Sequence, residues 1–266
     1  MARSALLNVM TNAAFKAGRS LSRDFGEIQN LQVSRKGPGD FVTNADLKAE
    51  KIIREELLAS RPKFGFLMEE SGETKGSDPQ NRWIVDPLDG TLNFMHGVPH
   101  FCISIALERE GEIVAGVIYN PATDELFVAE RGQGAFANDT RMRVAARREL
   151  ADCLMVTNIP RFGQSDHAGA LAEQAEVMKT TIGVRSSGST ALDLAYLAAG
   201  RFDGTWQRGP QAWDFAAGII MIREAGGFTT ALDGGRDMFG SGTILAGNEW
   251  IHKQLGDLVN GARQAE

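Results

Sequence analysis

The sequence predicts a single domain with a layered fold of the α/β (α+β) class. Three observations lead to this prediction: amphipathic helical patterns open the chain, short apolar runs joined by turns follow them, and strand-like and helix-like segments alternate in the second half. The chain has 266 residues, enough for one large domain or two small ones. Because no change in composition separates the halves, we expect one domain with two lobes, an antiparallel-sheet lobe of about residues 1–140 and an α/β lobe of about residues 141–266.

The first two elements are predicted as helices. Apolar residues recur at helical spacing over residues 3–25, and the same spacing returns over residues 44–59. Between them, residues 36–40 contain two glycines and a proline, a composition typical of a turn or a mobile loop. We treat this loop, which begins at Lys36, as a candidate functional loop.

Short apolar runs bounded by polar turns predict the strands of the first lobe. Two of them cover residues 64–68 and 83–85, and three more cover residues 101–107, 112–119 and 125–129. The connections between the last three are short. Consecutive strands joined by short turns pair antiparallel, so we expect a meander.

The second lobe is predicted from alternating elements. Strands are expected near residues 154–156 and 182–185, and helices over residues 166–179, 189–199, 214–225 and 249–259. Glycines follow two of these helices, at Gly200 and at Gly226, where they favour helix termination. This alternation favours helices packed on the faces of a sheet.

Composition excludes several classes of function. The net charge of −6 and the lack of a basic stripe argue against nucleic acid as a substrate. No apolar run approaches the roughly 18 residues that a membrane span needs, so we expect no membrane association and a cytoplasmic protein. Cys102 and Cys153 lie far apart and match no zinc or redox spacing, which favours buried, reduced thiols.

Acidic residues gather at the ends of three predicted elements. Glu69 and Glu70 close strand 64–68, Asp86 and Asp89 follow strand 83–85, and Asp214 stands where a helix begins. Each group has a structural alternative: a solvated charge pair for the first, an Asp-Gly turn for the second and a helix N-cap for the third. Sequence alone leaves these alternatives open.

The segment 86–91 favours a site over a simple turn. Because Pro87 cannot continue a strand ladder, we expect the chain to turn there and to bring its two aspartates and the Leu88 carbonyl toward one point. Gly90 can adopt unusual dihedral angles, and a helical turn starting at Thr91 would present free amides to an anion.

Thr43 and Asp46 form another ambiguous pair. They match the capping-box pattern ahead of the predicted helix 44–59. A structural role and a catalytic role of Asp46 are equally supported at this point, and the two roles are compatible.

Electrostatics decides what the acidic groups could bind if they converge. Two like charges about 4 Å apart repel by roughly 4 kcal/mol at an effective dielectric constant near 20. Several neighbouring carboxylates therefore stay ionised together only with cations. Carboxylates and a carbonyl suit Mg²⁺, Mn²⁺ or Ca²⁺, and no cluster of His and Cys stands nearby to favour zinc.

Two segments resemble the signatures of the inositol monophosphatase family. One is residues 83–94, centred on Asp86-Pro87-Leu88-Asp89-Gly90-Thr91, and the other is residues 213–227, which begins with Trp213-Asp214. Residues 42–46 with the Lys36 loop, residues 69–72 and residues 185–188 resemble further blocks in the expected order, so the resemblance spans nearly the whole chain. It implies a layered αβαβα fold of the inositol monophosphatase and sugar phosphatase type.

The resemblance also implies an activity. Such a protein would be a magnesium-dependent phosphomonoesterase that hydrolyses myo-inositol monophosphate, or a related polyol or sugar phosphate. It would bind about two or three Mg²⁺ ions per site, with Mn²⁺ as the alternative. The family is usually homodimeric and commonly inhibited by lithium.

The same resemblance implies the metal ligands. The ligands of a first ion would be Glu69, Asp86 and the Leu88 carbonyl, which match the family's positions. The ligands of a second ion would be Asp86, Asp89 and Asp214, again by the same resemblance.

The remaining site residues follow from the resemblance as well. Glu70 with Thr91, backed by Asp46, resembles the set that orients and deprotonates the attacking water. The amides of Gly90 and Thr91 would hold the phosphate. On the alcohol side of the substrate the family places the equivalents of Gly188, Ser189, Thr190, Gln207 and Asp214.

Gln207 departs from the family pattern, because many inositol phosphatases have a glutamate there. The amide keeps hydrogen bonding and loses the charge, which weakens the expectation of inositol phosphate more than that of phosphatase activity. The alternatives are a relative acting on fructose 1,6-bisphosphate, histidinol phosphate or a 3′-phosphonucleotide, although Leu92-Asn93-Phe94 argues against the nucleotide branch. A regulatory protein that binds transcription machinery is the alternative from another class, and no sequence feature encodes that partner.

Overall fold

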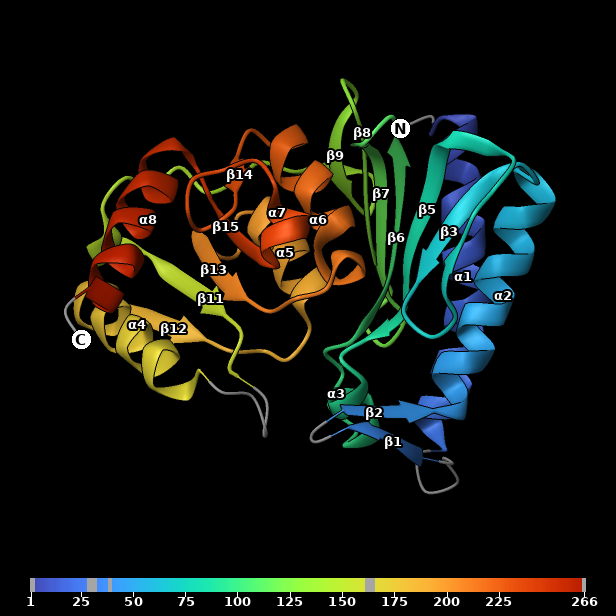
Figure 1. Ribbon diagram of the computed structural model, residues 1–266, viewed down its shortest axis with the longest axis horizontal. Coiled ribbons are helices and arrows are strands. Elements are labelled where there is room, and N and C mark those ends of the chain that lie inside the picture. The colour runs from blue at the N-terminus through green and yellow to red at the C-terminus, as the bar shows by residue number, and fades with distance from the viewer. Residues whose placement is uncertain (1–2, 28–32, 38–39, 161–165, 265–266) are drawn as a thin grey trace.

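Five layers of helices and sheets stack side by side in the computed structural model (Figure 1), which describes residues 3–27, 33–37, 40–160 and 166–264. Helices α1 (Ala5–Gly26) and α2 (Asn44–Ser60) cover one face of an eight-stranded sheet. Helices α5 (Thr190–Ala198) and α6 (Ala212–Glu224) lie between this sheet and a five-stranded sheet, whose other face is covered by α4 (His167–Thr180) and α8 (Glu249–Gln264). The predicted layered α/β (α+β) fold is confirmed.

Caps and apolar faces explain the two N-terminal helices. The N-cap of α1 is Ser4, whose Oγ accepts a hydrogen bond from the Leu7 amide at 3.1 Å. The inner face of α1 is buried against α2 and the sheet, and it carries Leu7, Met10, Ala14, Ala17 and Leu21. Both predicted helices are therefore present, within one or two residues of the expected bounds.

The eight-stranded sheet contains the predicted meander. Its order is β10-β9-β8-β7-β6-β5-β3-β4, and neighbouring strands from β5 to β10 are antiparallel. The strands are β3 (Phe64–Met68), β4 (Gly72–Thr74), β5 (Asp78–Asp89), β6 (Cys102–Arg109), β7 (Glu112–Asn120), β8 (Glu125–Glu130), β9 (Gly134–Ala137) and β10 (Thr140–Arg141). Because β3 pairs parallel with β5, the residues that follow both strands meet at the same edge of the sheet.

The prediction that the chain turns at Pro87 is wrong. Strand β5 continues to Asp89, and its pairing with β6 shifts register between Asp86, opposite Ser104, and Asp89, opposite Cys102. Proline lacks the N–H that a regular ladder requires, and such an irregularity accommodates it within a strand. The chain turns only after Asp89.

Residues 36–40, predicted as a turn or a mobile loop, lie where two strands of a hairpin meet. Strand β1 (Val33–Gly37) pairs antiparallel with β2 (Asp40–Thr43), so Lys36 and Asp40 lie in strands. Residues 41–43 are aromatic or β-branched, a composition that favours this extended backbone over a loop. Residues 38–39 and the side chain of Lys36 lie outside the described part of the chain, so a functional role of Lys36 stays a prediction.

The five-stranded sheet has the order β12-β11-β13-β15-β14. Its strands are β11 (Leu154–Thr157), β12 (Gly183–Arg185), β13 (Gly204–Arg208), β14 (Phe228–Thr230) and β15 (Thr243–Gly247). Strand β11 is parallel to β12 and β13, whereas β15 is antiparallel to β13 and β14. The strands expected near residues 154–156 and 182–185 are present. The sequence prediction missed β13, β14 and β15 and the short helix α7 (Met238–Ser241). The helical turn considered from Thr91 is present as α3 (Thr91–Met95).

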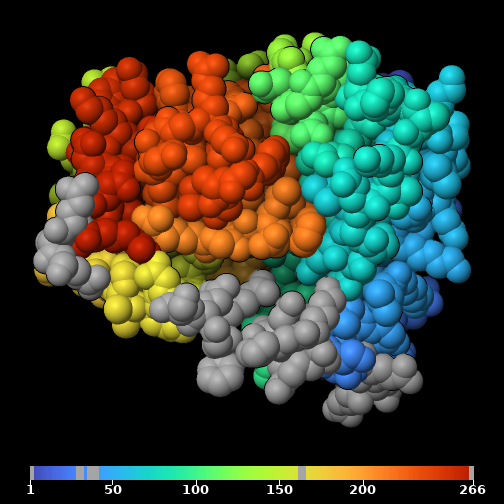
Figure 2. Space-filling view, viewed as in Figure 1, coloured from blue at the N-terminus to red at the C-terminus, as the bar shows by residue number. Residues whose placement is uncertain are grey.

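Close packing joins the two halves of the chain. Figure 2 shows the N-terminal part, coloured blue to green, in contact with the C-terminal part, coloured orange to red. Gly116 of β7 lies against α6, where an added Cβ would come within 2.8 Å of Ile220 Cγ2. At the start of α6, Ser104 Oγ of β6 donates to the Trp213 carbonyl at 3.2 Å. The first turn of α6 is thereby fixed next to the eight-stranded sheet.

Two other predictions concern the cysteines and membranes. Cys102 and Cys153 are free and buried, as predicted. Among the described residues, no helix combines the length and the hydropathy that crossing a bilayer requires.

Candidate active site

Three carboxylates from distant parts of the chain converge on one point. Asp86 and Asp89 lie at the end of strand β5, and Asp214 lies in the first turn of α6. Each offers a carboxylate oxygen, and these oxygens all lie within 4.8 Å of one another. The surface alternatives, an Asp-Gly turn and a helix cap without a further partner, therefore do not describe these residues.

Glu69 joins this acidic cluster from the neighbouring strand. Its amide donates to the Val85 carbonyl at 3.2 Å, which extends the pairing of β3 with β5 by one residue. Its carboxylate lies beside that of Asp86 and accepts a hydrogen bond when Asp86 is protonated. Burial, followed by the charges of Glu69, Asp89 and Asp214, raises the pKa of Asp86 well above its usual range. A cation would relieve this crowding of negative charge.

The chain turns directly after β3, at the two neighbouring glutamates Glu69 and Glu70. Both residues lie in a turn after Met68. The Glu70 amide donates to Glu50 Oε2 of α2 at 2.9 Å, and Glu50 is itself buried. Glu50 is a site residue that sequence reasoning missed. A signal existed, since Glu50 follows Asp46 by four residues and so lies on the same face of a helix.

Asp89 is held by residues from the second half of the chain. Its Oδ2 accepts hydrogen bonds from Ser189 Oγ at 2.7 Å and from the Ala191 amide at 2.6 Å. Burial raises the pKa of Asp89 to about 6 despite these two hydrogen bonds, which act in the opposite direction. The N-cap and first turn of α5 thus fix the orientation of this carboxylate.

Asp214 is the third residue of α6, so its prediction as an N-cap is wrong. The N-cap is Gln211, and the Gln211 amide donates to Asp214 Oδ2 at 2.7 Å. An acidic residue at this position reaches back to the cap in a capping box, which explains why the sequence pattern points to the helix start. Capping uses one carboxylate oxygen and is compatible with the place of Asp214 in the acidic cluster.

Gly90 and Thr91 open the short helix α3 beside the carboxylates. Gly90 has φ +95°, and an added Cβ would lie 3.0 Å from the His100 carbonyl oxygen, so the position requires glycine. The first intrahelical hydrogen bond runs from Phe94 N to Gly90 O at 3.0 Å, which leaves the preceding amides directed outward. This backbone suits a phosphoryl group.

Asp46 has both a structural and a site contact. Its Oδ2 accepts from the Thr43 amide at 2.9 Å, which completes the predicted capping box of α2. Its Oδ1 lies 3.2 Å from Thr91 Oγ1, which also lies 3.1 Å from the Leu88 carbonyl oxygen. Burial raises the pKa of Asp46. The two roles predicted for this residue are therefore compatible in the fold.

The residues predicted for the alcohol side lie together at α5 and β13. Gly188 precedes α5 with φ +87°, and Ser189 is the N-cap. Thr190 Oγ1 donates to Gln207 Oε1 at 2.8 Å, and Gln207 Nε2 donates to Thr205 Oγ1 at 3.4 Å. Gln207 is only 1% exposed, so these two threonines fix its amide.

Comparison with known proteins settles the family. A family model described as the inositol monophosphatase family matches residues 2–265. The chain belongs to the inositol monophosphatase family. This confirms the predicted family, and with the relatives below it confirms the predicted class of enzyme, a phosphatase.

Relatives and a solved structure extend this result for the inositol monophosphatase family. An inositol-1-monophosphatase of Mesorhizobium japonicum is 62% identical over 96% of each chain. The crystal structure of the extragenic suppressor protein suhB from Bartonella henselae is 60% identical, with a TM-score of 0.94 over 96% of this chain and 98% of the other. The Nus factor SuhB of Escherichia coli is 39% identical over 94% of each chain.

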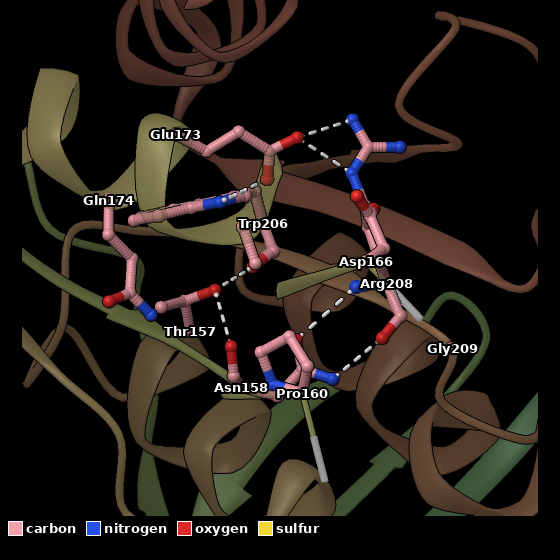
Figure 3. A pocket seen from close by; sticks show the side chains of 10 residues that line it. Thr157, Asn158, Pro160, Asp166, Glu173, Gln174, Trp206, Arg208 and Gly209 are labelled. Atoms are coloured by element: carbon pink, nitrogen blue, oxygen red, sulfur yellow. Dashed lines mark hydrogen bonds and ion pairs between the residues drawn. The ribbon is translucent and has the colours of Figure 1, made fainter. Parts of the chain in front are cut away.

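A separate cavity of about 380 Å³ lies at the ends of β11 and β13, beside α4 (Figure 3). Buried Glu173 lies in its wall and accepts hydrogen bonds from Trp206 Nε1 at 3.1 Å and Arg208 Nε at 2.8 Å. Glu173 also pairs with Arg263, which in turn pairs with Asp166. The two negative charges of Glu173 and Asp166 therefore offset the two positive charges of the arginines in the same wall. None of the residues of the acidic cluster lines the cavity, so it is distinct from the candidate active site of this family member.

Proposed function

We propose that this protein hydrolyses myo-inositol monophosphate, or a related polyol or sugar phosphate, to the alcohol and inorganic phosphate. The observation that carries the proposal is the convergence of Asp86, Asp89 and Asp214 beside the backbone of Gly90 and Thr91. Carboxylates without a metal would repel a phosphate dianion. Their position next to an anion-binding backbone therefore supports a reaction of phosphate esters with bound cations.

The donor set fits Mg²⁺, with Mn²⁺ as an alternative. The proposed ligands supply oxygen only, as hard divalent cations require, and they are Glu69, Asp86, the Leu88 carbonyl, Asp89 and Asp214. The raised pKa of Asp86 supports the same proposal, because crowded carboxylates stay ionised when cations neutralise them. Bound Mg²⁺, at about two or three ions per site, would supply Lewis acidity and offset the negative charge of the phosphoryl group.

The residues proposed to activate the attacking water are Glu70, Thr91 and Asp46. Thr91 Oγ1 donates a hydrogen bond to Asp46 Oδ1, 3.2 Å away. The lone pairs of Thr91 Oγ1 can then accept a hydrogen bond from the water. Glu70 would accept the second hydrogen of the water and take up its proton as the new P–O bond forms. The two acceptors together fix the orientation of the water, which accounts for much of the barrier reduction in phosphoryl transfer.

Phosphate and alcohol would be held by different lobes. The amides of Gly90 and Thr91 donate to the phosphoryl oxygens, whose charge grows in the transition state. Residues 188–190 and Gln207 would contact the alcohol. Because Gln207 is neutral, its contacts with hydroxyl groups are weaker than those of a glutamate.

A substrate panel tests this proposal. Phosphate release is measured from inositol 1-phosphate, sugar phosphates, fructose 1,6-bisphosphate, histidinol phosphate and a 3′-phosphonucleotide, with and without Mg²⁺. We expect the largest kcat/KM for inositol 1-phosphate or another polyol phosphate, and no release when a chelator removes the metal. A much larger kcat/KM for histidinol phosphate or the bisphosphate would transfer the proposal to that substrate. Lithium is expected to inhibit release in the same assay.

Assembly and location are proposed with the function. Resemblance to the family implies a homodimer, and three exposed apolar side chains on α4 and beside the edge strand β12 offer contact area: Leu171, Met178 and Ile182. Sedimentation of wild type and Met178→Asp measures this, and a dimer in both would exclude that face. Two free, buried cysteines suit a reducing compartment, which supports a cytoplasmic location that cell fractionation can test.

A partner in transcription is the second candidate role. The support is the name of relatives such as the Nus factor SuhB of Escherichia coli, which is 39% identical to this chain, while relatives at 60–62% identity are named for phosphatase activity. Pull-down of RNA polymerase or antitermination factors with a metal-site variant, Asp89→Asn, tests it. Retention of these proteins by the inactive variant would support the role. If cells that carry only this variant show every defect of cells that lack the protein, the result would count against it.

A further inference from the structure

Asn93 connects the phosphate side of the site to the alcohol side. It lies in α3, two residues after Thr91, and its Nδ2 donates to the His100 carbonyl at 2.7 Å and to the Ser187 carbonyl at 2.8 Å. An amide nitrogen has two hydrogens, so both are used. The first contact closes the loop that follows α3, and the second crosses to the α/β lobe.

The segment that receives the second contact is shaped around the asparagine. Gly188 has φ +87°, and an added Cβ would lie 2.9 Å from Asn93 Nδ2 and 3.3 Å from Asn93 Oδ1. The side-chain amide of Asn93 therefore packs directly on the backbone of residue 188. Residues 188–190, which the proposed function places on the alcohol side, begin immediately after the carbonyl that Asn93 holds.

Three other contacts cross between the lobes nearby. Asp89 accepts from Ser189 and Ala191, and the His100 ring lies 3.2 Å from Asp193 Oδ1. Asp89 fixes the start of α5 relative to the carboxylates, and His100 contacts Asp193 at the end of its first turn. The Asn93 contact differs because it ties residues 187–188 to α3 itself, the element that begins with the phosphate-binding backbone.

We propose that Asn93 is a positioning residue that sets the distance between bound phosphate and the alcohol-binding segment 187–190, and thereby the preference for the alcohol. This inference rests on the proposed function. Loss of the Asn93 amide leaves the four acidic residues and the Gly90 backbone in place, while the segment that would contact the alcohol loses its support. The effect should therefore appear in KM for substrates whose alcohol makes several hydrogen bonds, and less in the binding of phosphate itself.

The test compares Asn93→Ala and Asn93→Asp with a matched control, Asn248→Ala. Asn248 is buried, and like Asn93 it donates from Nδ2 to two carbonyls, those of Ala145 at 2.8 Å and Arg147 at 2.6 Å, away from the site. Three quantities are measured with Mg²⁺ present: KM for inositol 1-phosphate, KM for p-nitrophenyl phosphate, and inhibition by inorganic phosphate. Thermal unfolding of each variant is recorded in parallel.

We expect both Asn93 variants to raise KM for inositol 1-phosphate roughly tenfold, the lower end of the effects seen for supporting residues. KM for p-nitrophenyl phosphate and inhibition by phosphate should change less than about twofold. Asn248→Ala should lower Tm and leave the ratio of the two KM values unchanged. If the alanine variant does not fold, Asn93→Ser, which keeps one donor, takes its place.

An unchanged ratio of the two KM values would overturn the role of Asn93, whether both values rise by the same factor or neither rises. Failure of the proposed function has a different signature, namely a wild-type protein that does not hydrolyse inositol 1-phosphate. In that case the polyol or sugar phosphate with the largest kcat/KM in the panel replaces it, and the same ratio decides the inference.

Discussion

Ser189 donates a hydrogen bond from its Oγ to Asp89 Oδ2 at 2.7 Å, and this contact joins the end of β5 to the start of α5. The Ala191 amide donates to the same oxygen at 2.6 Å. Asp89 is therefore oriented by the start of α5, while its other oxygen remains available to the acidic cluster. A carboxylate fixed in this way needs no rearrangement to bind a cation, which is a form of preorganisation.

Asp89→Asn is expected to remove activity and to preserve the fold. The amide oxygen can still accept from Ser189 and Ala191, whereas the lost charge weakens cation binding. We expect kcat to fall at least about 100-fold and Tm to change by only a few degrees. Phosphate release and thermal unfolding measure these quantities.

The matched control for this variant is Asp203→Asn. Asp203 is also buried and accepts hydrogen bonds from the Leu154 amide at 2.8 Å and from Arg147 at 2.9 Å, outside the acidic cluster. It should leave kcat unchanged within about twofold. A wild-type kcat in Asp89→Asn would remove Asp89 from the mechanism.

The fold and the carboxylates were predictable because their signals are local. Apolar periodicity predicted α1, α2 and the meander, since each pattern lies within one short segment. Neighbouring acidic residues at strand ends predicted the place of Asp86 and Asp89. Convergence with Asp214 depended on resemblance to a family, because no local pattern shows that the start of α6 lies beside β5.

Contacts between distant segments could not be read from the sequence. Strand β13 combines Gly204 with the polar Thr205 and Gln207, so it lacks the apolar alternation of a predicted strand. Its place in the sheet follows from pairing with β11 and β15. The same holds for the Glu50 contact with Glu70, which depends on how α2 packs against the end of β3.

The metal-free protein is expected to lose stability as pH rises from about 4 to above 6. Burial raises the pKa of Asp89 from 3.8 to about 6 in the folded state, and it raises the pKa of Asp86 and Asp46 as well. A group with a raised folded pKa binds more protons folded than unfolded, so its contribution to stability is full at low pH and is lost as pH rises through the folded pKa. For Asp89 this amounts to roughly 1–3 kcal/mol.

Urea unfolding in a chelator across this pH range measures the effect. We expect a smaller loss of stability with pH in Asp89→Asn, which cannot titrate, and in wild type with saturating Mg²⁺, because the cation binds the ionised carboxylates. Identical pH profiles for wild type and the variant in chelator would show that Asp89 does not titrate as described.

Gln207→Glu is expected to shift the substrate preference toward inositol 1-phosphate and to destabilise the protein. A carboxylate makes stronger hydrogen bonds with substrate hydroxyls than an amide does. It also places a charge at a position that is only 1% exposed and removes the donor to Thr205, at a cost of about 1–3 kcal/mol. The kcat/KM ratio of inositol 1-phosphate to a sugar phosphate should rise several-fold.

The matched control for Gln207→Glu is Gln254→Glu, the same chemical change at a half-exposed position of α8 outside the site. It also loses one amide donor, the one to the Arg148 carbonyl, so it should cost about 1 kcal/mol of stability and leave the ratio unchanged. An unchanged ratio in Gln207→Glu would mean that residue 207 does not contact the alcohol.

Glu50 is expected to support catalysis through a single hydrogen bond. Its Oε2 accepts from the Glu70 amide at 2.9 Å. The Glu50 side chain is buried, and it belongs to α2, the helix that also carries Asp46. Glu50→Ala removes the acceptor and leaves the Glu70 amide without its partner, so the turn that carries Glu69 and Glu70 loses a constraint. We expect kcat to fall roughly tenfold, with a loss of stability of about 1–2 kcal/mol.

Glu50→Gln separates the hydrogen bond from the charge. Its amide oxygen can accept from the Glu70 N–H, so this variant should retain kcat within about twofold of wild type. A loss equal to that of Glu50→Ala would indicate that the negative charge of Glu50 matters instead, as part of the field that attracts cations. The Mg²⁺ concentration for half-maximal activity distinguishes the two cases, because only the loss of charge should raise it in both variants.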